Sequence, residues 1–178
     1  MGFSHRGTTF FRKHDDGNTL LLSLQKSTKS LASETLVTIN YGVYSARVGG
    51  RVKGSIQPAP DIWEAHWRRR LSEGKSEKWL RIESAATPEE VAGILLEAAA
   101  GVLFELEQRS SDEELRDEWL VGTSPGLTEM QRLVYLAILV SEIGPVDRLD
   151  DVWCQVRSNT HRDAIERQLA ELGIRLSA

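Results

Sequence analysis

One stretch decides the fold class of this chain: Thr35-Leu36-Val37-Thr38-Ile39-Asn40-Tyr41-Gly42-Val43-Tyr44. Positions 37, 39, 41 and 43 hold Val, Ile, Tyr and Val, and the residues between them are mostly small or polar. Alternation with a period of two is typical of a strand that has one apolar face against a core and a second, more polar face. We therefore predict an antiparallel strand over residues 35–44, in a half-buried sheet.

Two earlier runs are rich in the β-branched and apolar residues that strands favour, at 8–14 and 19–26. They are separated by Asp15-Asp16-Gly17-Asn18, residues that tolerate the positive φ of a hairpin loop. The three runs together predict an antiparallel meander. A fourth, edge-like strand is predicted over 78–83, where Trp79 and Ile82 alternate irregularly with polar residues.

The segment after the third strand has a different composition. Residues 46–60 are rich in Gly and Pro and carry three basic side chains, which predicts an exposed loop. Asp61 then stands where a helix cap would, and we predict a short helix that carries Trp63 and Trp67 one turn apart.

From residue 87 onwards the apolar residues recur with the period of a helix. Thr87-Pro88-Glu89-Glu90 combines a capping hydroxyl, a Pro at the first helical position and a Glu at the third. The capping signature recurs as Ser111 with Glu114 and as Thr128 with Gln131, the latter opening a helix that ends at 144–145. Two more helices are predicted, one over 162–172 and a shorter one around 152–156.

A sheet followed by helices indicates an α+β fold rather than alternating strands and helices. The length of 178 residues suits one domain or a domain with an appendage. We predict a sheet domain with a covering helix over 1–108, and a helical extension over 109–178 that belongs to the same compact unit.

The charge of the chain is divided in two. Residues 1–70 carry eleven Lys and Arg against five Asp and Glu, a formal +6, whereas residues 71–178 carry eleven against twenty-one, a formal −10. The total of −4 conceals this division. Such a division predicts electrostatic steering of a charged partner but does not specify a reaction.

The sequence shows no signal for export or membrane insertion, so we expect a cytoplasmic protein. The N-terminus lacks an apolar signal core, and the apolar run over 133–140 is too short to span a bilayer. The single cysteine, Cys154, has no partner for an internal disulfide, and its apolar neighbours Trp153 and Val156 favour a small core residue over a nucleophile.

Short motifs in the first third resemble a bacterial family known as domain of unknown function 4304. They are Gly2-Phe3, Gly7, Phe10-Phe11-Arg12, Gln25-Lys26-Ser27 and Asn40-Tyr41-Gly42-Val43-Tyr44. The resemblance is closest over residues 2–44 and fades after about residue 108. It implies a fold, with a helical second half that contains Trp, and no activity. Relatives usually carry a helix before the Gly-Phe pair, so the resemblance also implies that another element or a partner covers one face of the sheet.

One short motif matches the signature of a hydrolase. Gly122-Thr123-Ser124-Pro125-Gly126 matches G-x-S-x-G, and Asp147 and His161 follow in the order of a hydrolase triad. The residue after the nucleophile must donate its backbone N–H to the oxyanion, and Pro125 has none. We therefore interpret this segment as a loop between helices.

Other catalytic and ligand signals are also weak. The glycines at 49 and 54 have the spacing of a phosphate loop but lack the Lys and hydroxyl residue that follow in one. The histidines at 5, 14, 66 and 161 do not have the spacing of a zinc site. We assign no catalytic residue, metal or cofactor, and the sequence favours a non-enzymatic protein.

Two groups of residues remain as candidate sites. The polar residues Arg12, Gln25, Lys26 and Asn40 lie on neighbouring strands and would hold an anionic ligand if the register brings them to one face. Alternatively, they satisfy backbone groups of adjoining loops. Candidates for binding a partner are the aromatic and basic residues Trp63, Trp67 and Arg70 and the acidic residues Asp112, Glu113 and Asp117.

Three functions from different classes follow. The first is a protein-interaction module, immunity-like or antitoxin-like, whose acidic helical half binds a basic partner. The second is nucleic-acid binding through the basic half, with Arg47, Arg51, Lys53 and 68–70. The third is an enzyme or small-anion binder that uses the polar strand residues. No membrane partner is predicted, and the sequence leaves the oligomeric state open.

Overall fold

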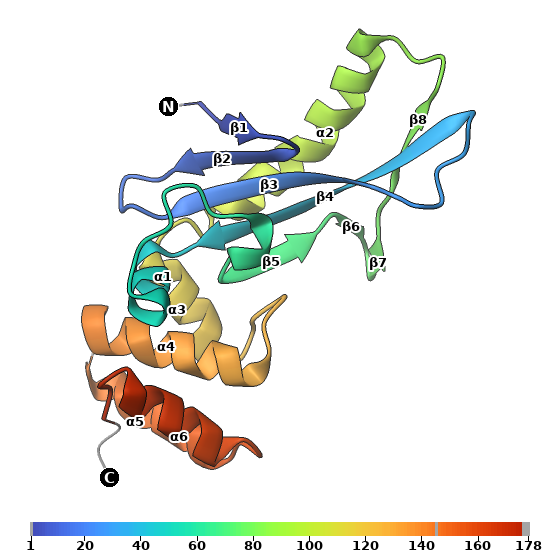
Figure 1. Ribbon diagram of the computed structural model, residues 1–178. Coiled ribbons are helices and arrows are strands. Elements are labelled where there is room, and N and C mark those ends of the chain that lie inside the picture. Colours follow the sequence, from blue (N-terminus) through green and yellow to red (C-terminus); the bar gives the residue numbers. More distant parts are fainter. Residues whose placement is uncertain (1, 145, 176–178) are drawn as a thin grey trace.

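The computed structural model describes residues 2–144 and 146–175. Figure 1 shows an antiparallel sheet formed by the first half of the chain, one long helix behind it and the other helices gathered at one end. The predicted α+β arrangement is therefore confirmed. The strands are β1 (Ser4–Arg6), β2 (Thr9–Lys13), β3 (Thr19–Lys26), β4 (Glu34–Tyr44), β5 (Trp67–Arg70), β6 (Ser72–Glu73), β7 (Ser76–Glu77) and β8 (Leu80–Glu83).

The main sheet follows the predicted meander. Its order is β1-β2-β3-β4-β5, and β8 pairs with the first half of β4 beyond the end of β5. The bounds of β2, β3 and β4 agree with the predicted runs to within one residue. Gly17 has a φ of 93° in the predicted hairpin loop, a conformation that glycine adopts without strain. The strands β1 and β5 were not predicted.

The pairing register gives the sheet two different faces. Leu20, Ile39 and Trp67 point to the face that the helices cover, which we call the helix-covered face. The opposite face was expected to be exposed where it is polar, but Thr38 and Asn40 are buried there. They are covered because the segment that carries the small hairpin β6-β7 folds back over this face, as the hydrogen bond from Thr38 Oγ1 to the carbonyl of Lys78 shows (2.9 Å).

The predicted helix caps are confirmed. Thr87, Ser111 and Thr128 each accept a hydrogen bond from the backbone N–H three residues on, and the Glu or Gln at that position closes a capping box. Pro145, in the predicted end of the third of these helices, lies outside the described residues. The helices are α1 (Ala46–Lys53), η1 (Ile62–Glu64), α2 (Pro88–Glu107), α3 (Asp112–Leu120), α4 (Glu129–Ile143), η2 (Val146–Arg148), α5 (Leu149–Arg157) and α6 (Arg162–Glu171).

The core is continuous from the sheet to the last helix. One cluster of buried apolar side chains includes Leu20 of β3, Leu136 of α4 and Leu169 of α6. A second, smaller cluster lies on the opposite face, where Ile62 of η1 covers Leu21 and Tyr44. No helix among the described residues combines the length and hydropathy that a membrane span requires.

Three local predictions are wrong. Residues 46–53 form α1 rather than a loop, because Ser45 caps the helix and Gly49 lets it pack directly against the ring of Tyr44. In place of the predicted helix through Trp63 and Trp67, the structure has the single turn η1, which contains Trp63, and Trp67 belongs to β5. Cys154 is exposed rather than in the core, because α5 buries Val152 and Val156 instead.

Gly42 is the tightest point of the sheet. A Cβ at this position would overlap the carbonyl oxygen of Trp67 and lie 2.8 Å from Cβ of Ala65. We expect Gly42→Ala to lower the free energy of unfolding by about 1–3 kcal/mol, the usual cost of overpacking. Gly93 in α2 has open space around it, so Gly93→Ala should raise that free energy by about 1 kcal/mol, as helix propensity dictates. Urea unfolding of both variants measures these two changes, which should have opposite signs. Changes of the same sign would contradict this prediction.

Candidate functional site

The register separates the four predicted ligand residues. Arg12 lies opposite Leu20 and Lys26 opposite Val37, so both belong to the helix-covered face. Gln25 and Asn40 lie on the opposite face. Arg12 forms an ion pair with Glu107 of α2. The structure therefore brings together only one pair of the four, Gln25 and Asn40.

Gln25 and Asn40 share their face with Arg70, one of the predicted partner residues. Asn40 Nδ2 donates to Gln25 Oε1 (2.9 Å), and Arg70 Nε donates to Asn40 Oδ1 (3.0 Å). Arg70 also donates to Gln25 Oε1 (3.3 Å) and to Glu77 Oε1 (2.8 Å), and its guanidinium lies over the ring of Trp79. These contacts fix the guanidinium of Arg70 at the edge of a depression in the surface.

This depression, which we call the Trp63 hollow, lies between η1, β5 and the loop before α4. Its wall includes the indole of Trp63, 65% exposed, and the half-buried side chain of Arg68. The loop contains the segment that matches the hydrolase signature. The carbonyl of Pro125 in this loop accepts a hydrogen bond from the N–H of Arg68 (3.3 Å), and the loop thereby covers the outer edge of β5. The lining includes Asn40, Trp63, Arg68, Arg70, Glu77 and Gly126.

Trp67, the other predicted aromatic contact, is completely buried on the helix-covered face. The guanidinium groups of Arg69 and Arg109 lie over its ring, at 5.5 and 4.8 Å from the ring centroid, and its Nε1 donates to Glu118 of α3 (3.2 Å). Because these groups come from β5, α3 and the segment between α2 and α3, Trp67 connects the sheet to the helices.

Tyr41 completes this network. Its hydroxyl donates to Glu105 of α2, which also pairs with Arg69. Burial and the hydrogen bond to Glu105 raise the pKa of Tyr41 above its ordinary value, so the phenol stays protonated at neutral pH. We interpret the network as structural, because the partners of each charged group lie within it.

The three acidic partner candidates occupy different environments. Asp112 is buried, and its carboxylate accepts hydrogen bonds from Ser45 Oγ (2.6 Å), Asn18 Nδ2 (3.1 Å) and Arg47 Nε (3.0 Å). It therefore joins the starts of α1 and α3 rather than facing solvent. Glu113 and Asp117 are exposed, and Asp117 pairs with the neighbouring Arg116.

His66 is a further buried polar residue that the sequence did not single out. Its ring lies 4.8 Å from that of Tyr44 and 5.0 Å from that of Tyr135, and its Nδ1 accepts the N–H of Ser45 (3.1 Å). Burial, with a smaller contribution from the charge of Lys53, lowers the pKa of His66 to about 3. The imidazole is therefore neutral at physiological pH.

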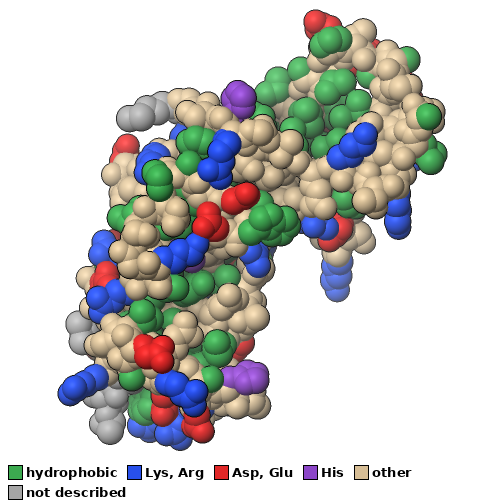
Figure 2. Space-filling model, in the orientation of Figure 1, with side chains coloured by type: hydrophobic (Ala, Val, Ile, Leu, Met, Phe, Trp, Pro, Cys, Tyr) green, Lys and Arg blue, Asp and Glu red, His purple; other side chains and the backbone are tan. Residues whose placement is uncertain are grey.

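Part of the charge of the two halves is paired within the fold. Arg12, Arg47, Arg51 and Arg69 of the basic half pair with Glu107, Asp112, Glu142 and Glu105 of the acidic half. Figure 2 shows basic and acidic side chains mixed over the visible surface. The charge division of the sequence thus serves internal pairing and does not by itself require a partner.

The helix α2 exposes two large apolar side chains. Apolar residues occur on every side of this helix, between five glutamates, yet Val102 and Leu106 are its only buried residues. Leu96 and Phe104 are 70% and 67% exposed, and the side toward the sheet is only half buried. Figure 2 shows hydrophobic side chains gathered at this end of the molecule. We call the exposed Leu96 and Phe104 the α2 patch; the half-buried Ile94, Leu95 and Ala98 pack against the core on the side toward the sheet.

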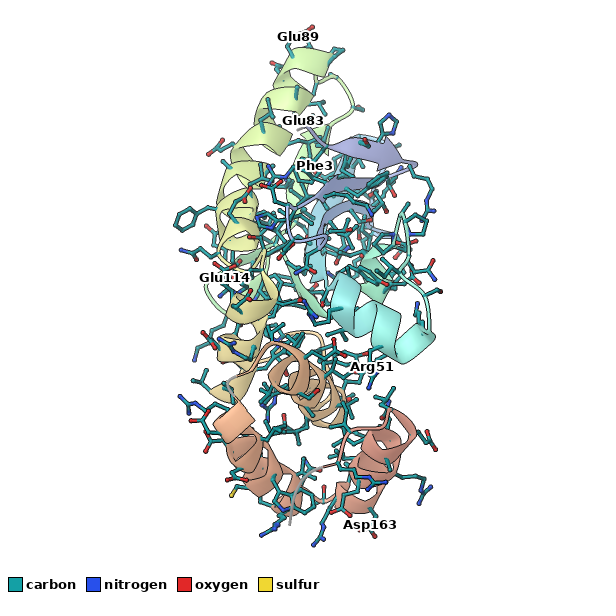
Figure 3. The ribbon with its side chains drawn as sticks, turned by 90° about the vertical axis from the view of Figure 1, so that its left-hand side faces the viewer. Phe3, Arg51, Glu83, Glu89, Glu114 and Asp163 are labelled. Carbon is teal, nitrogen blue, oxygen red and sulfur yellow. The ribbon has the colours of Figure 1, made fainter. Side chains whose placement is uncertain are left out.

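Carboxylates surround the start of α2. Glu83 precedes the helix, Glu89 and Glu90 lie in its first turn and Glu97 lies in its middle; within the part of the chain that the structure describes, none of them forms an ion pair. Figure 3 shows Glu83 and Glu89 at the same end of the molecule. Sequence reasoning missed Leu96 and Phe104, although the presence of apolar residues on every side of the helix was a visible signal.

The described residues contain no group of three His, Cys, Asp or Glu side chains arranged to hold a metal ion. The family model described as Domain of unknown function (DUF4304) matches residues 1–102, the whole sheet and most of α2. No curated protein and no solved structure matches the chain. Because the family model spans more than half of the 178 residues, the chain belongs to the DUF4304 family.

Proposed function

We propose that the protein is a non-enzymatic protein-interaction module, and that the α2 patch binds a partner segment that is apolar on one side and basic around it. The observation that carries this proposal is the exposure of α2. A helix normally buries its large apolar side chains, whereas α2 buries only Val102 and Leu106 and leaves Leu96 and Phe104 exposed.

The exposed side chains supply the binding energy. Covering a large apolar side chain contributes about 1.5–3 kcal/mol, and Leu96 and Phe104 lie two turns apart along α2. On the side toward the sheet, the half-buried Ile94, Leu95 and Ala98 pack against the core and hold the helix in place. Such an apolar centre with a polar rim is the usual composition of a protein interface.

The charge of the rim supports a basic partner. On α2 itself, Glu97 directly follows Leu96 and Glu89 and Glu90 lie in the first turn, with no cation of the described chain paired to any of them. Opposite charges across an interface accelerate association and determine orientation. We therefore keep the basic partner expected from the sequence but assign it to α2 rather than to α3, because Asp112 of α3 is buried.

The test uses two exposed side chains, so that the variants should stay folded. We expect the double variant Leu96→Ser, Phe104→Ser to raise the Kd for the purified partner by about 100-fold or more, because losing the burial of both side chains costs about 3 kcal/mol or more. Affinity of the natural protein should also fall with added salt, because the rim is charged. Titration calorimetry at two salt concentrations measures both effects.

Val121 provides the matched control. Val121 directly follows α3, away from α2, and is 80% exposed. Val121→Ser should therefore leave the affinity for the partner unchanged. Equal binding by the double variant and by the natural protein would refute the proposal. So would light scattering that shows a dimer which the double variant abolishes, because the occupant of the patch would then be a second copy of the chain.

A further inference from the structure

The Trp63 hollow has a composition that the proposed function does not use. Trp63 sits on the single turn η1, with Ile62 buried beneath it and Asp61 capping the turn. Glu64 of the same turn pairs with Lys53 of α1. A large indole is therefore exposed on a backbone that is fixed on both sides, an arrangement suited to stacking against a planar ring.

Arg68 lies beside this indole and has spare donors. Its Nη1 donates to the carbonyl of Trp63 (2.9 Å), and this is the one hydrogen bond of its guanidinium, which has five N–H groups, among the described residues. No carboxylate of the described chain forms an ion pair with Arg68. Its stem packs against Gly126, where a Cβ would clash with it.

The lining of the hollow carries more positive than negative side chains. Arg70 lines the same hollow, and the only carboxylate in the lining is Glu77, whose side chain is 56% exposed. By contrast, Arg47, Arg51 and Lys53, which the sequence offered as nucleic-acid contacts, are paired with Asp112, Glu142 and Glu64. Among these basic residues of the described chain, Arg68 is therefore the one that lies near an exposed aromatic ring and forms no ion pair.

We propose that the Trp63 hollow binds a phosphate ester that carries a planar base, with the base against Trp63 and the phosphate against Arg68. This is the chemistry of a nucleotide, either free or exposed in a single strand. An arginine beside an aromatic ring binds both parts of such a ligand, because guanidinium N–H groups match phosphate oxygens and the indole stacks on any base.

The experiment titrates the full chain with four probes: adenosine monophosphate, inorganic phosphate, a short single-stranded oligonucleotide and a poly-glutamate peptide. We expect adenosine monophosphate or the oligonucleotide to bind, and inorganic phosphate and the peptide to bind at least about tenfold more weakly, since they lack a base to stack. Tighter binding of the oligonucleotide identifies a strand as the natural source, and tighter binding of the mononucleotide identifies a free ligand. Equal affinity for all four probes, or no binding of either nucleotide probe, would overturn the proposal.

The variants locate the site. Arg68→Gln keeps the stem that packs on Gly126 and should weaken nucleotide binding by about tenfold or more, because it removes the charge-assisted hydrogen bonds. Trp63→Leu should weaken it by a similar factor. The control is Arg157→Gln, an exposed arginine whose guanidinium lies over the indole of Trp153 in α5, at 4.7 Å from its centroid. Equal weakening by Arg157→Gln would show that the effect is not specific to the hollow. Unchanged binding by Arg68→Gln would show that Arg68 does not hold the phosphate.

Discussion

Asp112→Ala should be among the most destabilising single substitutions in this protein, with an expected loss of about 3 kcal/mol in the free energy of unfolding. Its carboxylate accepts hydrogen bonds from Ser45, Asn18 and Arg47 in a buried position. Removing it takes one acceptor from each of these three groups at the point where α1 and α3 begin, and Asn18 keeps the carbonyl of Ser110 and the carboxylate of Asp16. Glu142 continues to pair with Arg47, which limits the loss.

The matched control is the next residue. Glu113 is exposed in the first turn of the same helix, so Glu113→Ala should cost no more than about 0.5 kcal/mol through the helix dipole. Urea unfolding monitored by circular dichroism measures both values. If the two variants lose similar stability, the hydrogen bonds of Asp112 with Ser45 and Arg47 do not stabilise the fold, and Asp112 behaves like an exposed residue.

Acid should destabilise the protein through His66. The pKa of His66 in the fold is about 3, below the value near 6.5 of an unfolded chain, so the unfolded state binds the proton first. The stability from the neutral imidazole is complete above pH 6.5 and is lost as pH falls from 6.5 toward 3. At pH 5 the expected loss is about 2 kcal/mol, 1.36 kcal/mol for each pH unit below 6.5.

His66→Asn isolates this contribution from that of the carboxylates. The amide oxygen of Asn replaces Nδ1 as the acceptor for the N–H of Ser45, and the side chain does not titrate. The variant will be less stable at pH 7.5 because it loses the ring contacts with Tyr44 and Tyr135. The quantity to compare is the change between pH 7.5 and pH 5, which should be about 2 kcal/mol smaller in the variant. Equal changes would place the acid sensitivity elsewhere.

The sequence predicted those elements whose signals are local. A capping box or a period-two alternation is complete within a few residues, so α2, α3, α4 and the strands β2 to β4 were found almost to the residue. The helix α1 was missed because its glycines suggest a loop, whereas contact with Tyr44 across the fold makes Gly49 necessary. Trp67 was assigned to a helix because its place in β5 depends on pairing with β4, 24 residues earlier at Val43.

The candidate sites depended even more on contacts distant in sequence. Side-chain direction in a strand reverses with each residue, so Gln25 and Lys26 diverge although they are neighbours. The hollow beside Trp63 requires β5 and the loop at 124–126 to meet, and no local pattern indicates that. The sequence shows apolar residues on every side of α2, but which of them stay exposed depends on how the sheet and the other helices pack against it.

The internal pairing of the two charged halves has a practical consequence for truncation. A fragment cut at residue 102, where the family match ends, keeps Arg12, Arg47, Arg51 and Arg69 but lacks the glutamates and the aspartate that hold them. Such a piece would present a cluster of bare guanidinium groups and adsorb to heparin or cellular RNA during purification. Nucleic acid that co-purifies with this fragment would therefore report the position of the cut rather than an activity of the intact molecule.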